Sequence, residues 1–459
     1  MPLIKSVSGM RGTLGGKPGE NLTPLDVVEL AAAFGSWLKE RKTGKRVVIG
    51  RDARPSGPMV ASLVRQTLCA MGFEVIDQGL STTPTVAMGV PRHQAAGGIV
   101  ITASHNPIQW NALKLLNEKG EFISAEAGRA LLGLLDERSF SFAEIEDLGV
   151  VVEDASACEF HVQEILRLPL VPVEEIRAKK FKVVLDPVNS TGALYLPPLL
   201  ERLGCEVHLI HGEVNGRFAH NPEPLPAHLT DLAKAVKQQQ ADLGIAVDPD
   251  VDRLVLVCED GSMFGEEYTL VAVADYILSQ KPGPVVSNLS SSRALCDVAK
   301  RYGQDCFASA VGEVHVVKKM KEVSAVIGGE GNGGVIYPDL HYGRDALVGI
   351  ALFLASLAQR NKAASALRSD YPQYEMIKDK IPLTAAVNPD VLLEKLGRLF
   401  AERQNKINTE DGLKIEKEQS WVHLRKSNTE PILRLYAEAP SQKEARALAD
   451  EVQQAMQNL

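Results

Sequence analysis

Residues 98–107 read Gly-Ile-Val-Ile-Thr-Ala-Ser-His-Asn-Pro, an apolar run that ends abruptly in a polar segment. The run at 98–101 predicts a short buried strand, and 102–107 predicts the turn that follows it. An Asn-Pro pair at the end of the segment supports chain reversal there. Loops that follow buried strands often carry reactive groups, so Ser104 is a candidate nucleophile, with His105 beside it in sequence.

A second polar cluster, Asp248-Pro249-Asp250-Val251-Asp252-Arg253, lies between apolar runs at 244–247 and 254–257. Flanking buried strands would hold its carboxylates in a fixed loop. Carboxylates at alternate positions can converge on one hard divalent cation, and Mg²⁺ prefers oxygen ligands. The cluster therefore predicts a magnesium site, against the plainer alternative of a solvated surface turn.

Two further segments follow in chain order, Gly-Glu-Gly-Asn-Gly-Gly at 329–334 and Arg-Lys-Ser-Asn-Thr-Glu-Pro at 425–431. Together the four segments resemble the phosphoserine, metal, sugar-binding and phosphate-binding loops of the α-D-phosphohexomutase superfamily, which comprises phosphoglucomutases, phosphomannomutases and phosphoglucosamine mutases. The resemblance spans essentially the whole chain. It implies an isomerase, an intramolecular phosphotransferase that moves phosphate reversibly between the 6 and 1 positions of a hexose or hexosamine phosphate.

The resemblance also implies the site residues and cofactors. Ser104 would carry the phosphate through a sugar bisphosphate intermediate, and the cofactors would be Mg²⁺ and a hexose bisphosphate that acts as activator and intermediate. The implied catalytic residues are Ser104, Lys114, Arg11 and His105, and the implied metal ligands are Ser104, Asp248, Asp250 and Asp252. The implied substrate-binding residues are Arg253, His315, Glu330, Asn332, Arg425, Ser427, Asn428 and Thr429.

Side-chain chemistry agrees with several of these roles. Lys114 could act as general base and acid for the accepting hydroxyl. Glu330 can accept hydrogen bonds from adjacent sugar hydroxyls, and the glycines around it let the backbone approach closely. Arg425 offers a planar fork for bidentate phosphate contact. For His105 the alternative is a purely structural role, and for His315 it is a core histidine.

The substrate and the activity have named alternatives. Many hexose-phosphate mutases carry Ser and His after the loop glutamate, whereas this chain has Asn332 and Gly334, which most resembles archaeal-type phosphoglucosamine mutases. Phosphoglucosamine mutase is therefore the leading hypothesis, followed by phosphoglucomutase or phosphomannomutase. A catalytically silent sugar-phosphate-binding protein and a metal-dependent phosphatase are the rivals from other classes. The chain departs from the family at Ala112, where glycine is usual, and at Lys426, where proline or an apolar residue is usual.

Composition narrows the class of protein. The chain has 459 residues, 45% hydrophobic and 24% charged, which is typical of a globular protein of about three or four domains. No apolar run reaches the ~20 residues of a membrane span, and the start lacks a secretory apolar segment, so the predicted location is cytoplasmic. A net charge of −8 disfavours nucleic-acid binding. The expected partners are small sugar phosphates, with no nucleic acid and no membrane, and the expected state is a monomer or homodimer.

The predicted fold class is α/β, with three related α/β domains in tandem and a smaller C-terminal α+β domain around a central cleft. Apolar strands followed by polar turns recur at 47–49, 183–186 and 284–286. From about residue 371 the pattern changes to strands at 422–425 and 432–437 and a final helix after Ser441. The predicted domains are 1–155 with the phosphoserine loop, 156–258 with the metal loop, 259–370 with the sugar-binding loop and 371–459 with the phosphate-binding loop.

Cysteine spacing excludes two kinds of site. The six cysteines, at 69, 158, 205, 258, 296 and 306, form no Cys-x-x-Cys pair. This spacing argues against a zinc site and against a redox dithiol. Most of them are expected to be small buried apolar residues.

Overall fold

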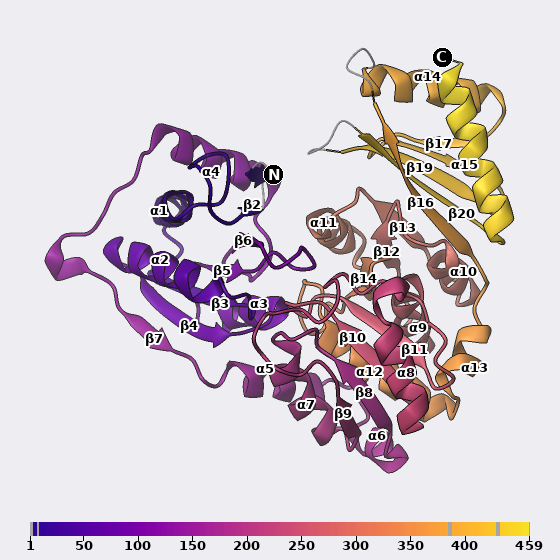
Figure 1. Ribbon diagram of the computed structural model, residues 1–459, viewed down its shortest axis with the longest axis horizontal. Helices are drawn as coiled ribbons and strands as arrows, with labels where there is room; N and C mark the ends of the chain where they lie inside the picture. The colour runs from indigo at the N-terminus through magenta and orange to yellow at the C-terminus, as the bar shows by residue number, and fades with distance from the viewer. Residues whose placement is uncertain (1–2, 7–8, 384–387, 428–431, 459) are drawn as a thin grey trace.

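The computed structural model describes residues 3–6, 9–383, 388–427 and 432–458. Within these ranges the chain forms three α/β domains in tandem and a C-terminal domain around an antiparallel sheet (Figure 1). The predicted fold class is therefore confirmed. The domain boundaries at 155, 258 and 370 stay predictions.

The first domain contains a seven-stranded mixed sheet in the order β1-β2-β6-β5-β3-β4-β7. Helix α1 begins where the sequence predicts it, because Thr23 and Asp26 form a capping box and Pro24 occupies the first turn. The strands are β1 (Ile4–Ser6), β2 (Gly9–Thr13), β3 (Arg46–Arg51), β4 (Glu74–Leu80), β5 (Gly97–Ile101), β6 (Trp110–Leu116) and β7 (Val151–Glu153). The helices are α1 (Pro24–Arg41), α2 (Gly57–Ala70), α3 (Thr83–Arg92) and α4 (Ala125–Glu137), with a 3₁₀ turn at Ile145–Asp147.

The second and third domains each contain a four-stranded sheet, in the orders β11-β10-β8-β9 and β13-β12-β14-β15. The second domain has β8 (Lys182–Asp186), β9 (Glu206–Leu209), β10 (Leu243–Val247), β11 (Leu254–Cys258), α5 (Ala157–Leu166), α6 (Val173–Lys179), α7 (Gly192–Arg202) and α8 (Thr230–Gln239), with a 3₁₀ turn at Pro226–His228. The third has β12 (Val285–Asn288), β13 (Cys306–Ser309), β14 (Ile327–Glu330), β15 (Gly334–Ile336), α9 (Glu266–Gln280), α10 (Ala294–Arg301), α11 (Glu313–Val323), α12 (Ala346–Arg360) and α13 (Ala364–Ser369).

One four-strand pattern recurs in all three domains. The strands that the sequence predicts at 47–49, 183–186 and 284–286 are the first strand of each pattern, β3, β8 and β12. In each case the third strand lies parallel to the first and the fourth lies antiparallel to the third. The serine, aspartate and glutamate segments all follow the third strand, on the turn into the fourth. Because this turn starts at the carboxyl end of a parallel strand, the fold places all three at the sheet edge where α/β proteins bind ligands.

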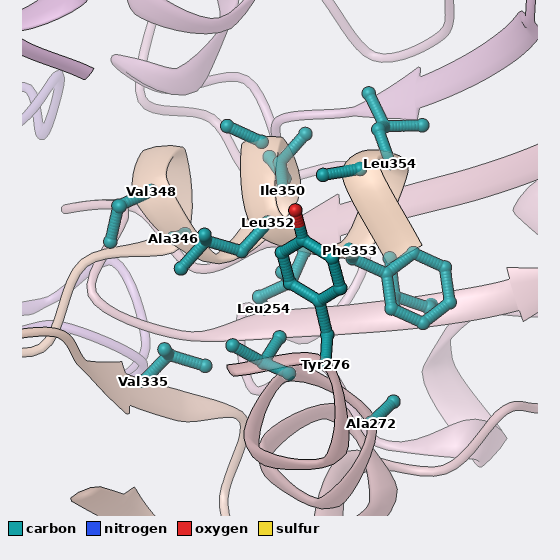
Figure 2. Close-up of a cluster of buried hydrophobic side chains, with 14 of the residues drawn as sticks. Leu254, Ala272, Tyr276, Val335, Ala346, Val348, Ile350, Leu352, Phe353 and Leu354 are labelled. Carbon is teal, nitrogen blue, oxygen red and sulfur yellow. The ribbon is translucent and has the colours of Figure 1, made fainter. Parts of the chain in front are cut away.

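The second and third domains share one hydrophobic core. Tyr276 of α9 and Phe353 of α12 lie in it together with Leu254 of β11 (Figure 2). The cluster continues without a break into the second sheet, whereas the first and C-terminal domains have cores of their own. Burial of apolar surface is the main favourable contribution to folding, about 25 cal/mol per Å². The shared core therefore holds the aspartate turn in a fixed position relative to the glutamate turn.

The C-terminal domain contains a five-stranded antiparallel sheet in the order β16-β20-β19-β18-β17. The strands predicted at 422–425 and 432–437 are β19 and β20, and Ser441 caps the final helix as predicted. The elements are β16 (Glu375–Pro382), α14 (Pro389–Glu402), β17 (Lys406–Asn408), β18 (Leu413–Glu416), β19 (Trp421–Lys426), β20 (Ile432–Ala439) and α15 (Gln442–Gln457). Across the described ranges, no helix is both long and apolar enough to cross a membrane.

Two cysteines are paired. Cys296 of α10 and Cys306 at the start of β13 form a disulfide with a Cα–Cα distance of 5.2 Å, which is within the usual range for such a bond. Cys69, Cys205 and Cys258 are buried free thiols, in agreement with the sequence prediction. The disulfide was not predicted, because its two cysteines are brought together by the packing of α10 beside β13.

Candidate active site

The candidate nucleophile lies on the turn between β5 and β6. Ser104 has a left-handed backbone conformation, with φ of 50°, which is uncommon for residues other than glycine. Its amide donates to Thr102 Oγ1 at 2.9 Å, and Thr102 Oγ1 donates to the buried carboxylate of Asp52 at 2.6 Å. Backbone strain of this kind persists only where the surroundings hold it, and it is typical of functional turns.

Arg54, in the polar turn after the predicted strand at 47–49 and not among the predicted site residues, lies fully buried beside the serine turn. Its guanidinium donates to the carbonyl oxygens of Asn106 at 2.7 Å and Pro107 at 2.8 Å, and it also donates to the carbonyl oxygen of Ser104. An ion pair with Asp52 at 2.9 Å holds it from the other side. Only arginine offers five donors in a rigid fork. One side chain therefore fixes the backbone path of the serine turn.

The aspartate cluster lies on the turn between β10 and β11, and its three carboxylates are fully buried. Asp248 Oδ1 accepts hydrogen bonds from the amides of Asp252 and Arg253, each at 3.1 Å. Val251, at the centre of the turn, has φ of 62°, a strained conformation for a β-branched residue. The prediction of a loop fixed between buried strands is confirmed, and the alternative of a solvated surface turn is wrong.

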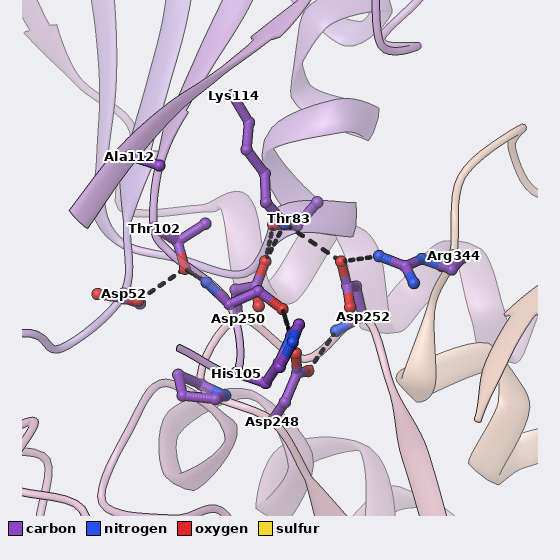
Figure 3. A network of polar contacts seen from close by, with 12 residues as sticks. Asp52, Thr83, Thr102, His105, Ala112, Lys114, Asp248, Asp250, Asp252 and Arg344 are labelled. Carbon is purple, nitrogen blue, oxygen red and sulfur yellow. Dashed lines mark hydrogen bonds and ion pairs between the residues drawn. The ribbon is translucent and has the colours of Figure 1, made fainter. Parts of the chain in front are cut away.

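The serine and aspartate turns meet (Figure 3). Ser104 Oγ donates to Asp248 Oδ2 at 2.6 Å. Lys114 of β6 extends its ammonium to Asp250 Oδ2 at 2.6 Å and to Asp252 Oδ2 at 3.2 Å. The fold thus assembles the predicted nucleophile, the predicted lysine and the three predicted metal ligands from two domains.

The arrangement of the carboxylate oxygens suits a divalent cation. Asp250 Oδ1 and Asp252 Oδ1 are buried and have no hydrogen-bond partner among the described residues, which is unfavourable for buried polar oxygens. Ligand atoms of the three aspartates lie within 4.8 Å of one another. All these donors are hard oxygens, the type that Mg²⁺ prefers. The residues therefore fit the predicted metal.

Burial and neighbouring charges shift the pKa values of Asp248 and Lys114. Burial raises the pKa of Asp248 well above its ordinary value, and the neighbouring Asp252 and Asp250 raise it further. Burial opposes the charge of Lys114, but Asp250 and Asp252 outweigh it and raise the lysine pKa. Lys114 is therefore an ammonium group in this arrangement.

His105 lies beside the nucleophile, with Nδ1 3.4 Å from Ser104 Oγ. Burial lowers the pKa of His105 well below its ordinary value, and the positive charge of Arg253 lowers it further. The imidazole is therefore neutral at physiological pH. A neutral ring next to a hydroxyl can accept its proton, so the geometry is compatible with the proton-handling role that the family resemblance implies.

The glutamate segment forms the turn between β14 and β15. Glu330 Oε1 accepts from Asn288 Nδ2 at 2.9 Å and from the Gly312 amide at 3.1 Å. Asn332 Oδ1 accepts from the Gly334 amide at 3.2 Å and so shapes the turn itself. Glycine is required at position 333, where φ is 83° and a Cβ would lie 2.3 Å from the backbone carbonyl oxygen of Leu254.

A second residue that was not predicted, Arg344, joins the glutamate turn to the aspartate turn. It donates to Asp252 Oδ2 at 2.7 Å (Figure 3). It also donates to Glu330 Oε2 at 3.0 Å. A third contact reaches Glu313 Oε2 at 2.9 Å. Neither arginine is among the predicted site residues, because the contacts that bring them to the site are long-range: Arg54 meets the Ser104 carbonyl across 50 positions, and Arg344 meets Asp252 across 92.

The other predicted residues lie at different distances from this centre. Arg253 Nε is 3.9 Å from Asp252 Oδ1 and 4.0 Å from Asp248 Oδ2. Arg11 reaches Asn106 Oδ1 of the serine turn at 3.4 Å. His315 lies in the first turn of α11 with an exposed side chain, so the alternative of a core histidine is wrong. Its role in specificity stays a prediction.

The phosphate-type segment begins at the end of β19. Arg425 forms an ion pair with Asp411 at 2.7 Å, and Asp411 also accepts from the Val311 amide of the third domain at 2.8 Å. Arg425 lies directly opposite Arg434 of β20 in the sheet. Two arginines placed opposite each other repel, which favours an anion between them. Ser427 donates from its amide to the Ile432 carbonyl at 3.0 Å, while Asn428 and Thr429 lie outside the described residues.

Four protein-family domains match consecutive segments of the chain, and each segment contains most of the strands of one of the four sheets. Residues 3–141, 159–261 and 265–374 match the phosphoglucomutase/phosphomannomutase alpha/beta/alpha domains I, II and III. Residues 384–455 match the phosphoglucomutase/phosphomannomutase C-terminal domain.

Individual relatives cover almost the whole chain. A probable phosphoglucosamine mutase of Methanopyrus kandleri is 35% identical over 446 residues, which are 97% of this chain and 95% of the relative. A phosphoglucomutase/phosphomannomutase of Thermococcus kodakarensis is also 35% identical, over 95% of each chain. Among solved structures, a phosphoglucomutase/phosphomannomutase family protein from Burkholderia thailandensis has a TM-score of 0.85 at 26% identity and covers 99% of this chain and 97% of its own.

Proposed function

Because the chain belongs to the phosphoglucomutase/phosphomannomutase family and is a phosphohexomutase, we propose that its preferred substrate is a glucosamine phosphate. The composition of the sugar-type loop supports this choice, since the chain has Asn332 and Gly334 after Glu330. A relative that is 35% identical is named a probable phosphoglucosamine mutase. Another at the same identity is named a phosphoglucomutase/phosphomannomutase, so glucose and mannose phosphates are the second candidates.

The observation that carries the mechanism is the contact of Ser104 Oγ with Asp248 at 2.6 Å, beside Lys114 and two carboxylate oxygens that lack partners. Asp248, Asp250 and Asp252 would hold Mg²⁺, with an oxygen of the serine group as a further ligand. When bound, the ion would neutralise negative charge on the transferring phosphoryl group, which phosphoryl transfer chiefly requires. A catalytically silent binding protein has no need of this combination.

Transfer would proceed in two halves. In the first, the bond between phosphorus and Ser104 Oγ breaks and a bond to a sugar hydroxyl oxygen forms, while a base removes the hydroxyl proton and Ser104 Oγ takes up a proton. The resulting bisphosphate turns over in the site. In the second half, Ser104 Oγ gives up its proton and accepts the other phosphoryl group, and the sugar oxygen that loses it takes back a proton. A free hexose bisphosphate would therefore also serve as an activator, because it can rephosphorylate Ser104.

His105 and Lys114 would handle the proton transfers. His105 is neutral and can accept a proton at the ring. Asp250 and Asp252 hold Lys114 as an ammonium group, so it would have to release its proton before it could act as the base that the family resemblance implies. General acid and base catalysis needs one group in each state at the start of a half-reaction. Arg11 and Arg253 would orient the phosphoryl oxygens from the two sides of the serine turn.

The distal phosphate would bind at the C-terminal domain. Arg425 and Ser427 would contact it together with Asn428 and Thr429, and Glu330 and Asn332 would contact the sugar hydroxyls. Fixing one phosphate in one place lets the sugar bind in two orientations, so that either phosphate can reach Ser104. His315 would contribute from the first turn of α11.

The test is ³¹P NMR on the purified phosphoprotein with Mg²⁺, in separate samples of glucosamine 6-phosphate, glucose 6-phosphate and mannose 6-phosphate. Fastest conversion of glucosamine 6-phosphate to a 1-phosphate is the expected result. Faster conversion of glucose or mannose phosphate overturns the substrate assignment. Net release of inorganic phosphate instead indicates a phosphatase, and binding without conversion indicates a silent binding protein.

A further inference from the structure

Arg344 contacts carboxylates from three separate segments of the chain. Its Nη2 atom donates to Asp252 at 2.7 Å. Its Nη1 atom donates to Glu330 at 3.0 Å, and its Nε atom donates to Glu313 at 2.9 Å. The arginine side chain is 10% exposed, and none of the three acidic side chains exceeds that value. The planar guanidinium suits such a role, because its donors point in fixed directions. A single buried cation thus bridges the aspartate turn and the glutamate turn.

The backbone of Arg344 is held firmly. The next residue, Asp345, caps α12 by accepting from the amides of Leu347 at 2.8 Å and Val348 at 3.3 Å. The same carboxylate accepts from His161 at 2.8 Å and lies 3.2 Å from His341 Nε2. Asp345 also donates its amide to β15. The position of the guanidinium is therefore set by the second and third domains together.

The glutamate turn leaves room for this arginine. A Cβ at Gly334 would lie only 2.3 Å from Arg344 Cδ. Any side chain at position 334 would displace the arginine, so the two positions depend on each other. Gly334, which distinguishes this chain from many hexose-phosphate mutases, thus leaves the space that Arg344 needs to contact both turns.

The bridge limits how each carboxylate can turn. Asp252 Oδ2 accepts hydrogen bonds from both Arg344 and Lys114, which leaves Oδ1 as the oxygen that has no hydrogen-bond partner among the described residues. Glu330 Oε2 receives Arg344, while its Oε1 receives Asn288 and Gly312. A shift of either carboxylate on binding a ligand would move the shared guanidinium and so affect the other.

We propose that Arg344 is a positioning residue that couples cation binding at the aspartate turn to sugar-phosphate binding at the glutamate turn, an inference that rests on the proposed function. It orients Asp252 for the cation and Glu330 for the sugar, and it touches neither ligand. Such coupling is reciprocal, because each ligand must change the affinity for the other by the same factor.

Isothermal titration calorimetry on the full-length unphosphorylated protein tests this. Mg²⁺ is titrated with and without saturating glucosamine 6-phosphate, and the sugar phosphate is titrated with and without Mg²⁺. The wild type should show a change in affinity of about 5- to 150-fold. Arg344→Gln and Arg344→Lys should each reduce this factor to less than about twofold, because a single ammonium group cannot reach all three carboxylates.

Glu313→Gln is the matched control. It alters the one partner of Arg344 that belongs to neither ligand site, so the coupling should persist. Circular dichroism establishes that each variant is folded, and if Arg344→Gln is not, Arg344→Lys carries the test.

Two outcomes overturn the inference: a wild type that binds both ligands without coupling, and an Arg344→Lys variant with the wild-type factor. Failure of the proposed function looks different, because the wild type would then show no conversion of any sugar phosphate by ³¹P NMR.

Discussion

Ser104 Oγ lies 2.6 Å from Asp248 Oδ2, although 144 positions separate the two residues along the chain. The two residues lie on equivalent turns of two related domains. A further contact joins the domains at the same place, since Thr83 at the start of α3 donates its amide to the Asp250 carbonyl at 2.9 Å. The candidate reaction centre therefore exists only when the first and second domains are packed together.

Replacing Ser104 with alanine should abolish phosphate transfer. The variant lacks the oxygen that would carry the phosphoryl group, so conversion should fall by at least about 10³-fold, as for other nucleophile deletions. Binding of glucosamine 6-phosphate should persist, because the distal phosphate contacts are intact. ³¹P NMR measures the conversion, and calorimetry measures the binding of glucosamine 6-phosphate. Ser139→Ala, at an exposed position outside the site, is the control, and substantial turnover by Ser104→Ala would exclude a phosphoserine mechanism.

Replacing Arg54 with methionine should destabilise the protein. The change leaves Asp52 without its buried partner, and it strips the serine turn of its main donor. Removing one member of a buried ion pair typically costs about 3–5 kcal/mol. Urea unfolding measures the free energy, and Arg129→Met on the exposed face of α4 should change it little. A loss below about 1 kcal/mol would show that the turn is held by other contacts.

The sequence predicts the individual turns of this site better than the long-range contacts that join them. The serine and aspartate turns follow short apolar runs, a local pattern that marks strand ends. Helix α1 likewise follows from Thr23-Pro24, because capping is a local interaction. Arg54 also follows an apolar run, at 47–49, but this local pattern does not show that its side chain reaches the serine turn. Arg344 meets Asp252 across 92 positions, and only the packing of α12 against the shared core brings them together.

His315 and Glu313 also show what the sequence does not predict, although they are only two positions apart. The family resemblance assigns His315 to the site, and its side chain is exposed in the first turn of α11. Glu313, two positions earlier, turns inward to Arg344. Burial raises the pKa of Glu313 to about 6, although Arg344 opposes the rise. Which face of a helix meets the site depends on how the helix packs, and the motif alone does not contain that information.

Replacing Arg425 with alanine should weaken substrate affinity more than it slows the bound-state step. Arg425 would bind the distal phosphate, which takes no part in bond breaking. The KM of the variant should therefore rise, with a smaller change in kcat. Steady-state kinetics with the preferred sugar phosphate measure both. Lys426→Ala is a matched control, because Lys426 points to the opposite face of β19 and pairs with Asp390 at 2.9 Å. An unchanged KM with a collapsed kcat would assign Arg425 to the chemical step.

Replacing Glu267 with glutamine should make the protein more stable at alkaline pH. Burial raises the pKa of Glu267 to about 8, only partly offset by Lys378, from an ordinary value of 4.5. The folded protein therefore keeps a proton that the unfolded chain loses. Glu267 therefore makes its full contribution to the free energy of unfolding below pH 4.5. This contribution is lost as the pH rises to about 8, by up to about 1.4 kcal/mol per pH unit.

Glutamine does not titrate, so the free-energy difference between Glu267→Gln and the wild type should grow between pH 5 and pH 8 and then level off. Urea unfolding at several pH values measures it. Glu266→Gln, which alters the neighbouring carboxylate that pairs with Lys378 at 2.5 Å, should lack this growing gain. Parallel stability curves for Glu267→Gln and the wild type would show that Glu267 is already ionised in the folded protein.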